Sequence, residues 1–475
     1  MNFKCVKKID GQYDKIVIFT DSTKLVLPDY FSKESQKNIK TLISKEEFLP
    51  EESKKVELNL VDGDSVINLI ISWLGDPKKL DAKNLREHIY DTLKNITGKV
   101  LVAFEDPEFD NPGVIAEVVE HINYKFDKYL SKKKDKFLQV EYLTEKRVPK
   151  LLEGYELAKI SNIVKDLINE QSEVMTPHAL AMKAQELGKE FGFEVEILDE
   201  HNAYDLGMHS YLSVARAAHH RPYVIVMRYF GDEKHEYKYG LVGKGLTYDT
   251  GGLSLKPTAS MLGMKEDMGG AATMIGAMCS VAKMKLKKNV VCVVAACENS
   301  IGPNAYRPGD IVNTMNGKTV EVTNTDAEGR LTLIDALTYI IRNEKVDEVI
   351  DAATLTGAIM VALGEDVTGV FSNDDKAAKK LIKASENWNE FFWQMPMFDS
   401  FKRYLKSDIA DLQNTGSRFG GSVNAAKFLE EFVEGKRWIH LDIAGTVFSH
   451  NSGNPYYEKG PTGQVFRTIY SYIKD

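Results

Sequence analysis

The segment from Asn324 to Arg330 carries two acidic residues, Asp326 and Glu328, only two positions apart. Alternating residues over 318–323 predict a strand before it, and the apolar spacing after Arg330 predicts a helix. Carboxylates so close repel each other unless a cation neutralises them or one takes a proton. The same pair also suits a helix N-cap with an acidic first turn, which stabilises a helix by about 1 kcal/mol. The pair alone therefore does not establish a metal site.

Residues 241–256 form a second segment that could carry out chemistry. In it an apolar run leads into a glycine-dense loop. The loop region bears Lys244, Asp249 and Lys256, and its glycines allow the backbone to fold closely around an ion or a substrate. A phosphate-binding loop is disfavoured, since G-x-x-x-x-G-K-[ST] would need glycine where Lys238 stands and a hydroxyl residue where Gly245 stands.

Four carboxylates share one kind of position, at the end of a predicted strand or the start of a predicted helix: Asp249, Asp267, Asp326 and Glu328. Active sites of α/β sheets lie at the carboxyl ends of strands. Together with Lys244, four such groups can hold two metal ions about 3.5–4 Å apart, as two-metal hydrolases do. Oxygen ligands suit Mn²⁺, Mg²⁺ or Zn²⁺. The histidines include no H-E-x-x-H motif, and we interpret His219, His220 and His440 as structural.

These positions need a scaffold, and residues 151–475 provide one as a predicted catalytic domain. Apolar strands are predicted over 223–229, 239–247, 288–296 and 348–353, and helices over 178–191, 269–284 and 331–342. This alternation predicts a mostly parallel or mixed sheet with helices on both faces. Thr176 and Pro177 fit an N-cap and a first helical position.

Residues 1–150 predict a smaller α/β domain in which no motif indicates chemistry. Strands are predicted over 15–20 and 99–104 and a helix over 81–96, whereas 65–74 fits either; a long helix over 143–171 is predicted to connect the domains. The lysine-rich run 131–136 could be a basic patch, but a solvated loop is favoured.

Composition points to a globular protein. Its 475 residues are 43% hydrophobic and 27% charged, with a net charge of −8 that argues against broad nucleic-acid binding. Four cysteines form no C-x-x-C pair, and Cys292 and Cys297 are predicted to be buried free thiols. Neither a signal peptide nor a membrane-spanning stretch is recognisable, so a cytoplasmic location is expected.

Six segments resemble motifs of the leucyl aminopeptidase family, the two-metal cytosol aminopeptidases, and they occur in that family's order. The resemblance covers about residues 155–475, and its motifs are 242–252, 264–271, 305–310, 324–330, 352–357 and 440–445. It implies that residues 1–150 form the family's small α/β domain, similar to macro domains. Departures at 169–173, 208–209 and 217–218 affect segments that hold no ligands in the family.

The resemblance implies a metalloaminopeptidase that releases N-terminal residues, preferably Leu and other apolar ones. One Mn²⁺ or Zn²⁺ would be held by Asp249, Asp326 and Glu328, and the other by Lys244, Asp249, Asp267 and Glu328. A water or hydroxide bridging the ions would attack the peptide bond. Lys244 would have to be neutral to act as a ligand. The substrate's free α-amine would bind one metal near Asp267.

The resemblance also assigns catalytic and substrate-binding residues. Lys256 would donate to the scissile carbonyl oxygen as negative charge develops, and Arg330 would hold a bicarbonate ion that shuttles the proton. The pocket for the first side chain would be lined by Met264, Asn324, Thr354, Gly357, Ala444 and Val447.

Assembly and partners follow from the same resemblance. A homohexamer acting on peptides is implied, and some family members also act as DNA-binding regulators. The acidic balance and the lack of a clear basic stripe argue against a DNA-binding role here. A salt-dependent gel shift would distinguish that alternative. A catalytically dead homologue is disfavoured, because every predicted ligand and both catalytic residues are present.

Overall fold

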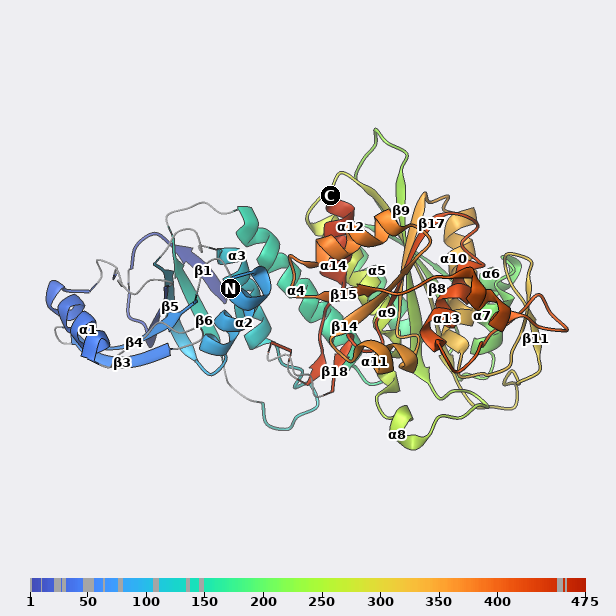
Figure 1. Ribbon diagram of the computed structural model, residues 1–475, viewed down its shortest axis with the longest axis horizontal. Coiled ribbons are helices and arrows are strands. Elements are labelled where there is room, and N and C mark those ends of the chain that lie inside the picture. The colour runs from blue at the N-terminus through green and yellow to red at the C-terminus, as the bar shows by residue number, and fades with distance from the viewer. Residues whose placement is uncertain are drawn as a thin grey trace. The chain divides into compact units, whose positions relative to one another are not determined.

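The computed structural model describes most of the chain, namely residues 2–9, 11–20, 27, 31–45, 55–62, 65–75, 80–105, 111–133, 137–144, 149–450, 456–457 and 459–475. Within them the chain forms two compact units, 1–159 and 160–475, that divide inside one helix. An α/β architecture with a smaller N-terminal and a larger C-terminal part is confirmed (Figure 1).

The N-terminal unit is built on a six-stranded sheet in the order β1-β6-β5-β2-β4-β3. Its strands are β1 (Phe3–Val6), β2 (Lys15–Thr20), β3 (Lys55–Asp62), β4 (Ser65–Trp73), β5 (Gly98–Phe104) and β6 (Leu138–Leu143), and its helices are α1 (Lys33–Lys45), α2 (Ala82–Leu93) and α3 (Pro112–Asn123). Only the β3–β4 pair is antiparallel among these pairings. The ambiguous segment 65–74 is thus a strand, which suits its buried position in the sheet.

The helix predicted over 143–171 starts later than expected. Leu143 ends strand β6, and helix α4 spans Pro149–Asn169, with residues 145–148 outside the described part. The predicted helix overlaps β6 only at Leu143, and one apolar residue at the end of an element carries too little pattern to separate strand from helix. Pro149 suits a first helical position, where its missing N–H leaves no bond unmade. In the lysine-rich run, 131–133 is exposed and irregular, and 134–136 lies outside the described residues.

The C-terminal unit contains an eight-stranded mixed sheet in the order β15-β14-β17-β13-β9-β10-β8-β7. These strands are β7 (Glu194–Leu198), β8 (Tyr223–Phe230), β9 (Lys238–Asp249), β10 (Asn289–Asn299), β13 (Glu348–Ala353), β14 (Val367–Ser372), β15 (Phe391–Gln394) and β17 (Arg437–Asp442). The central strands β17, β13, β9 and β10 run parallel, so their carboxyl ends meet at one edge. The predicted mixed sheet is confirmed.

Helices cover both faces of this sheet (Figure 1). The unit includes α5 (Pro177–Phe191), α6 (Glu200–Asp205), α7 (His209–Ala215), α9 (Gly269–Lys283), α10 (Glu328–Arg342), α11 (Gly357–Leu363), α12 (Asp375–Ser385), α13 (Gly421–Glu430) and α14 (Phe466–Lys474), with 3₁₀ helices η3 (Met264–Met268) and η4 (Asp399–Leu405). The short helix α8 (Thr258–Met261) projects away from the sheet. The Thr176 hydroxyl accepts from Ala179 N at 3.2 Å, which confirms the predicted cap of α5.

The two helices that matter for the site pack on opposite faces of β9. A Cβ at Gly243 would lie 2.7 Å from Ala271 Cα of α9, and a Cβ at Gly240 would lie 3.2 Å from Ile340 of α10. Glycine at 243 therefore lets α9 approach the strand closely. Two small sheets complete the unit, formed by β11 (Ile311–Asn313), β12 (Thr319–Glu321) and β16 (Leu412–Gln413), and by β18 (Phe448–Ser449) and β19 (Gly460–Pro461).

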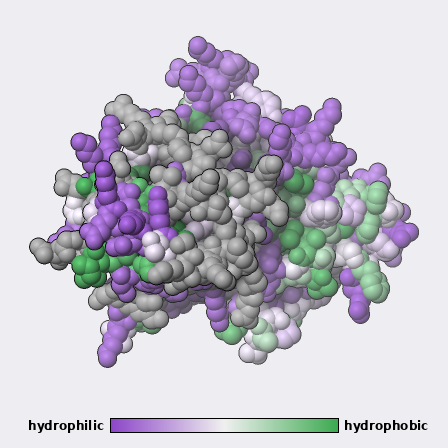
Figure 2. Space-filling model, turned by 60° about the vertical axis from the view of Figure 1, so that its left-hand side comes forward, coloured by the Kyte–Doolittle hydropathy of each residue, from purple (hydrophilic) through white to green (hydrophobic). Residues whose placement is uncertain are grey.

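The core and surface agree with the composition. Cys292 and Cys297 are buried free thiols, as predicted, and burial raises the pKa of both. On the face drawn in Figure 2, hydrophilic side chains surround smaller groups of apolar ones. Among the described residues, no helix is both long and apolar enough to span a membrane.

Candidate active site

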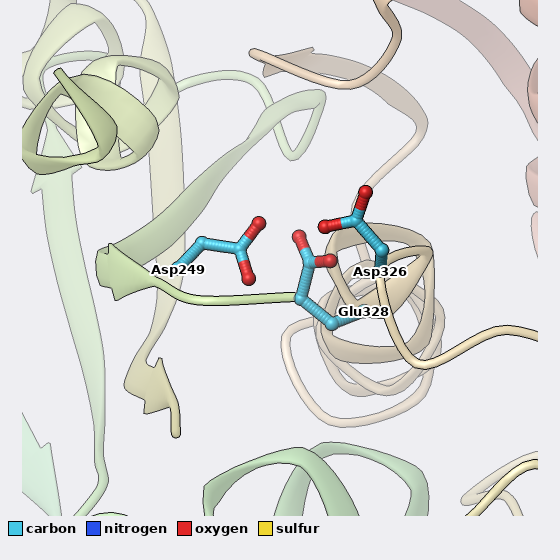
Figure 3. Close-up of side chains that lie close together, drawn as sticks. All are labelled: Asp249, Asp326 and Glu328. Atoms are coloured by element: carbon cyan, nitrogen blue, oxygen red, sulfur yellow. The ribbon is translucent and has the colours of Figure 1, made fainter. Parts of the chain in front are cut away.

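Three carboxylates from two segments of the chain point toward one another (Figure 3). Asp249 is the last residue of β9, Glu328 begins α10, and Asp326 lies in the turn just before it. One oxygen from each lies within 4.8 Å of the others, a spacing that a shared metal ion would suit. The expectation that active-site residues lie at the carboxyl ends of strands therefore selected residues that are close in space although nearly 80 positions apart in sequence.

Lys244 faces these carboxylates from the middle of β9. Its Nζ donates to Asp267 Oδ1 at 2.7 Å and to the Thr354 carbonyl oxygen at 2.9 Å, and it lies 3.0 Å from Glu328 Oε1. A Cβ at position 329 would stand 2.4 Å from Lys244 Cε, so only glycine there leaves room for the lysine. Gly329 is therefore a steric requirement of the site.

Asp267 lies in η3, directly before α9, and is buried. The Thr354 hydroxyl donates to Asp267 Oδ1 at 2.7 Å, which fixes the carboxylate. Asp267 Oδ2 is also buried but has no hydrogen-bond partner within the described chain. The same holds for Glu328 Oε2. Buried oxygens normally accept a hydrogen bond or bind a cation, so these two unpartnered oxygens indicate that a cation binds here.

Lys256 joins the remaining two carboxylates. Its Nζ lies 2.8 Å from Asp249 Oδ2 and 2.6 Å from Asp326 Oδ1, and its side chain is only 15% exposed. A mostly buried ammonium is not ordinary surface charge. Its position at the rim of the acidic group lets it face a bound molecule.

Polar residues that the sequence analysis did not single out form hydrogen bonds with Asp249 and with the loop that follows it. Asn299 Nδ2 donates to Asp249 Oδ1 at 2.8 Å and to Thr325 O at 3.0 Å. The Thr325 hydroxyl donates to Gly251 O at 2.6 Å and accepts from Ser254 N at 2.8 Å. Asn299 ends β10 beside Asp249, so the rule that found Asp249 could also have found it.

The electrostatics of the group favour bound cations. Burial raises the pKa of Asp249 to about 6 and that of Asp267 to about 8. Burial also opposes the charge of Glu328, but Lys244 and Lys256 outweigh it and lower its pKa. Four carboxylates, three of them buried, face two buried or mostly buried ammonium groups, so acidic groups are in excess. The donor set and the unpartnered oxygens fit divalent metal ions.

Lys244 itself carries a proton in these surroundings. Burial lowers the pKa of its ammonium group, but Asp267 and Glu328 outweigh burial and raise it well above the usual value. The neutral amine that a ligand role requires therefore depends on cations bound beside it.

Arg330 lies in the first turn of α10 and is buried. One guanidinium nitrogen donates to Asn414 O at 2.7 Å, while Nε has no partner in the part of the chain that the structure describes. Burial lowers the pKa of Arg330 to about 10, so the group still carries its charge at neutral pH. A buried cation with a free donor can hold an anion.

The predicted pocket residues occupy different positions around this centre. Thr354 binds Asp267, and Val447 Cγ2 would lie 2.3 Å from a Cβ at Gly269, directly after η3. Asn324 Oδ1 accepts from Asp326 N at 2.8 Å, so this residue shapes the acidic turn. Met264 lies in η3, Gly357 begins α11 and Ala444 follows β17. All six residues stay predictions as pocket residues.

Two of the three histidines predicted to be structural lie within hydrogen-bond distance of carboxylates, whereas His219 has a ring contact with His220. His440 is buried, and its Nδ1 lies 2.6 Å from Asp351 Oδ1. His220 Nδ1 lies 2.8 Å from Glu298 Oε1.

Replacing Thr354 with valine removes the hydroxyl that fixes Asp267. We expect the affinity for Mn²⁺ to fall by about 10- to 100-fold, as is usual when an outer partner of a ligand is lost. A Mn²⁺ titration of activity and of direct binding measures this, with the exposed Thr258→Val variant as control. Equal affinities in Thr354→Val and the wild type would contradict the assignment.

A mixed α/β fold with buried carboxylates at strand ends is the architecture of a metal-binding hydrolase. Residues 162–470 match the model of the cytosol aminopeptidase family, catalytic domain. Residues 16–133 match that family's N-terminal domain. The chain belongs to the cytosol aminopeptidase family, as the sequence motifs predict.

Relatives and solved structures agree over almost the whole chain. A probable cytosol aminopeptidase of Fusobacterium nucleatum is 71% identical and covers 100% of this chain and 99% of its own length. One of Clostridium perfringens is 41% identical, covering 95% and 96%. A mutant of tomato leucine aminopeptidase superposes with a TM-score of 0.86 at 31% identity, covering 100% and 96%. The bottromycin maturation enzyme BotP in complex with Mn superposes with a TM-score of 0.85 at 28% identity, covering 97% and 99%. The chain is therefore a metal-dependent aminopeptidase.

Proposed function

We propose that two divalent ions bind between β9, η3 and the start of α10. Asp249, Asp326 and Glu328 would hold one ion; Lys244, Asp267 and the shared carboxylates of Asp249 and Glu328 would hold the other. The single observation that carries this proposal is the buried, converging set of carboxylates with unpartnered oxygens. Mn²⁺ or Zn²⁺ suits such ligands, and the Mn complex of BotP favours manganese.

When bound, the metal ions supply Lewis-acid polarisation and an acidified water. Lys256 then has the task of donating a hydrogen bond to the scissile carbonyl oxygen as its negative charge grows. Its ammonium form suits this, since burial is outweighed by Asp249 and Glu328, which raise its pKa. One of the ions would also bind the substrate's free α-amine, with Asp267 nearby.

Proton transfer in this proposal involves Arg330 rather than a carboxylate. The four acidic residues of the site would all serve as ligands to the two ions, so none of them would be left as general base. We propose that Arg330, through its free Nε–H, holds a bicarbonate ion that moves the proton. The first turn of α10 adds the favourable field of a helix N-terminus for such an anion.

The proposal also covers substrate preference, cellular location and assembly. Peptides with an N-terminal Leu or other apolar residue would place that side chain among Met264, Asn324, Thr354, Gly357, Ala444 and Val447. The relatives' name favours a cytoplasmic location, and the family resemblance favours a homohexamer. In the proposed division into 1–150 and 151–475, every residue of the site belongs to the catalytic metallopeptidase domain.

Removal of metal tests the proposal directly. We expect a leucine anilide to be hydrolysed by the purified protein, to resist hydrolysis after chelation, and to be cleaved again when Mn²⁺ or Zn²⁺ is restored. An N-acetylated leucine anilide should stay intact throughout, because its α-amine is blocked. Cleavage of the blocked substrate would contradict the amine-binding role, and full activity after complete chelation would contradict the metal centre.

A further inference from the structure

A second group of ionisable side chains lies outside the predicted ligands and consists of Glu266, Glu365 and His450. Glu266 belongs to η3, Glu365 follows α11, and His450 follows β18. His450 Nε2 lies 3.8 Å from Glu266 Oε1, and His450 Nδ1 lies 3.8 Å from Glu365 Oε1. Both distances exceed those of hydrogen bonds, so the imidazole does not satisfy either carboxylate.

Glu266 is the unusual member of this group. Its side chain is only 10% exposed, and Oε2 is buried with no hydrogen-bond partner among the described residues. Burying a carboxylate without a partner costs several kcal/mol unless something pairs with it. The unpaired oxygen therefore points to a cationic ligand.

The group shares its chain segments with the predicted pocket for the first side chain. Met264 precedes Glu266 by two residues in η3, and Val447 packs against Gly269 at the start of α9. A Cβ at Gly445, next to Ala444, would lie 3.1 Å from Glu365 Cα. Predicted pocket residues and members of this group therefore share segments, Met264 with Glu266 and Val447 with His450, and Glu365 lies beside the second of these segments.

We propose that Glu266, supported by Glu365, binds the cationic head of a lysine or arginine side chain at the N-terminal residue of the substrate. This inference rests on the proposed aminopeptidase function and deepens it. Lysine and arginine have apolar stems and charged heads, which match an apolar wall with a carboxylate at its end. N-terminal leucine and methionine side chains still fit the apolar part of the pocket. The side chain of an N-terminal aspartate or glutamate would be repelled by the carboxylates of Glu266 and Glu365.

The test compares arginine with citrulline, which has nearly the same shape but no charge. In the Mn²⁺-loaded wild type we expect kcat/KM for the arginine anilide to exceed that for the citrulline anilide by at least about 10-fold, as for a charged hydrogen bond. In Glu266→Gln the ratio should fall toward one, and in Glu365→Gln it should fall less. The exposed Glu386→Gln variant is the matched control and should keep the wild-type ratio.

The ratio within each enzyme separates a change of specificity from a general loss of activity. A wild type that favours citrulline, or a ratio that is equal in the wild type and both variants, would overturn the proposal. If Glu266→Gln instead lost a bound Mn²⁺ and the ratio stayed unchanged, the group would be an inorganic cation site and the proposal would also fail. Failure of the aminopeptidase function would show differently, because the wild type would then cleave none of the free-amine anilides.

Discussion

Glu328→Gln should reduce hydrolysis of a leucine anilide by at least about 10²-fold, even with Mn²⁺ at saturating concentration. Loss of an outer partner already costs 10- to 100-fold, and Glu328 is proposed to contact both ions directly. The substitution keeps the shape of the side chain but removes the charge that faces Lys244 at 3.0 Å. Steady-state kinetics across a Mn²⁺ titration measures the effect.

The control for this variant is Glu386→Gln, which changes an exposed glutamate at the end of α12 and should retain full activity. Thermal denaturation of both variants shows whether each is folded before activities are compared. A folded Glu328→Gln protein with more than half of the wild-type activity would rule out the bridging role.

Lys256→Met should lower kcat by about 10²- to 10³-fold, the usual loss when one donor to a developing oxyanion is removed. KM should change little, because the proposed hydrogen bond strengthens only as charge builds on the carbonyl oxygen. Lys256 also lies 2.8 Å from Asp249, so the metal content of the variant must be measured beside its kinetics.

The exposed Lys234→Met variant is the matched control for this charge removal and should behave as the wild type. An unchanged kcat with a raised KM would show that Lys256 binds only the ground state. That result would remove it from the catalytic residues.

Much of the catalytic scaffold could be predicted because its signals are local. Apolar strands such as β9 and β10 and the small-residue helix α9 have strong patterns, and Asp249, Asp326 and Glu328 follow from their places at element ends. The start of α4 was missed because Leu143, a single apolar residue at the end of β6, carries too little pattern to separate strand from helix.

Other features could not be predicted, because they depend on contacts between distant segments. Thr354 bonds to Asp267 across 87 positions, and no local pattern marks that hydroxyl as a partner of a ligand. Glu266 is a charged residue with no local pattern that marks it as buried, and only the folded chain, in which it lies beside His450, reveals its burial. Its lack of a partner is a property of the folded chain alone.

The most direct test of the central claim is anomalous X-ray diffraction from crystals of the Mn²⁺-loaded protein. We predict two manganese peaks per chain among the five proposed ligands, which are Lys244, Asp249, Asp267, Asp326 and Glu328. A single peak, or peaks only at other residues, would contradict the two-metal centre on which the account of this aminopeptidase rests.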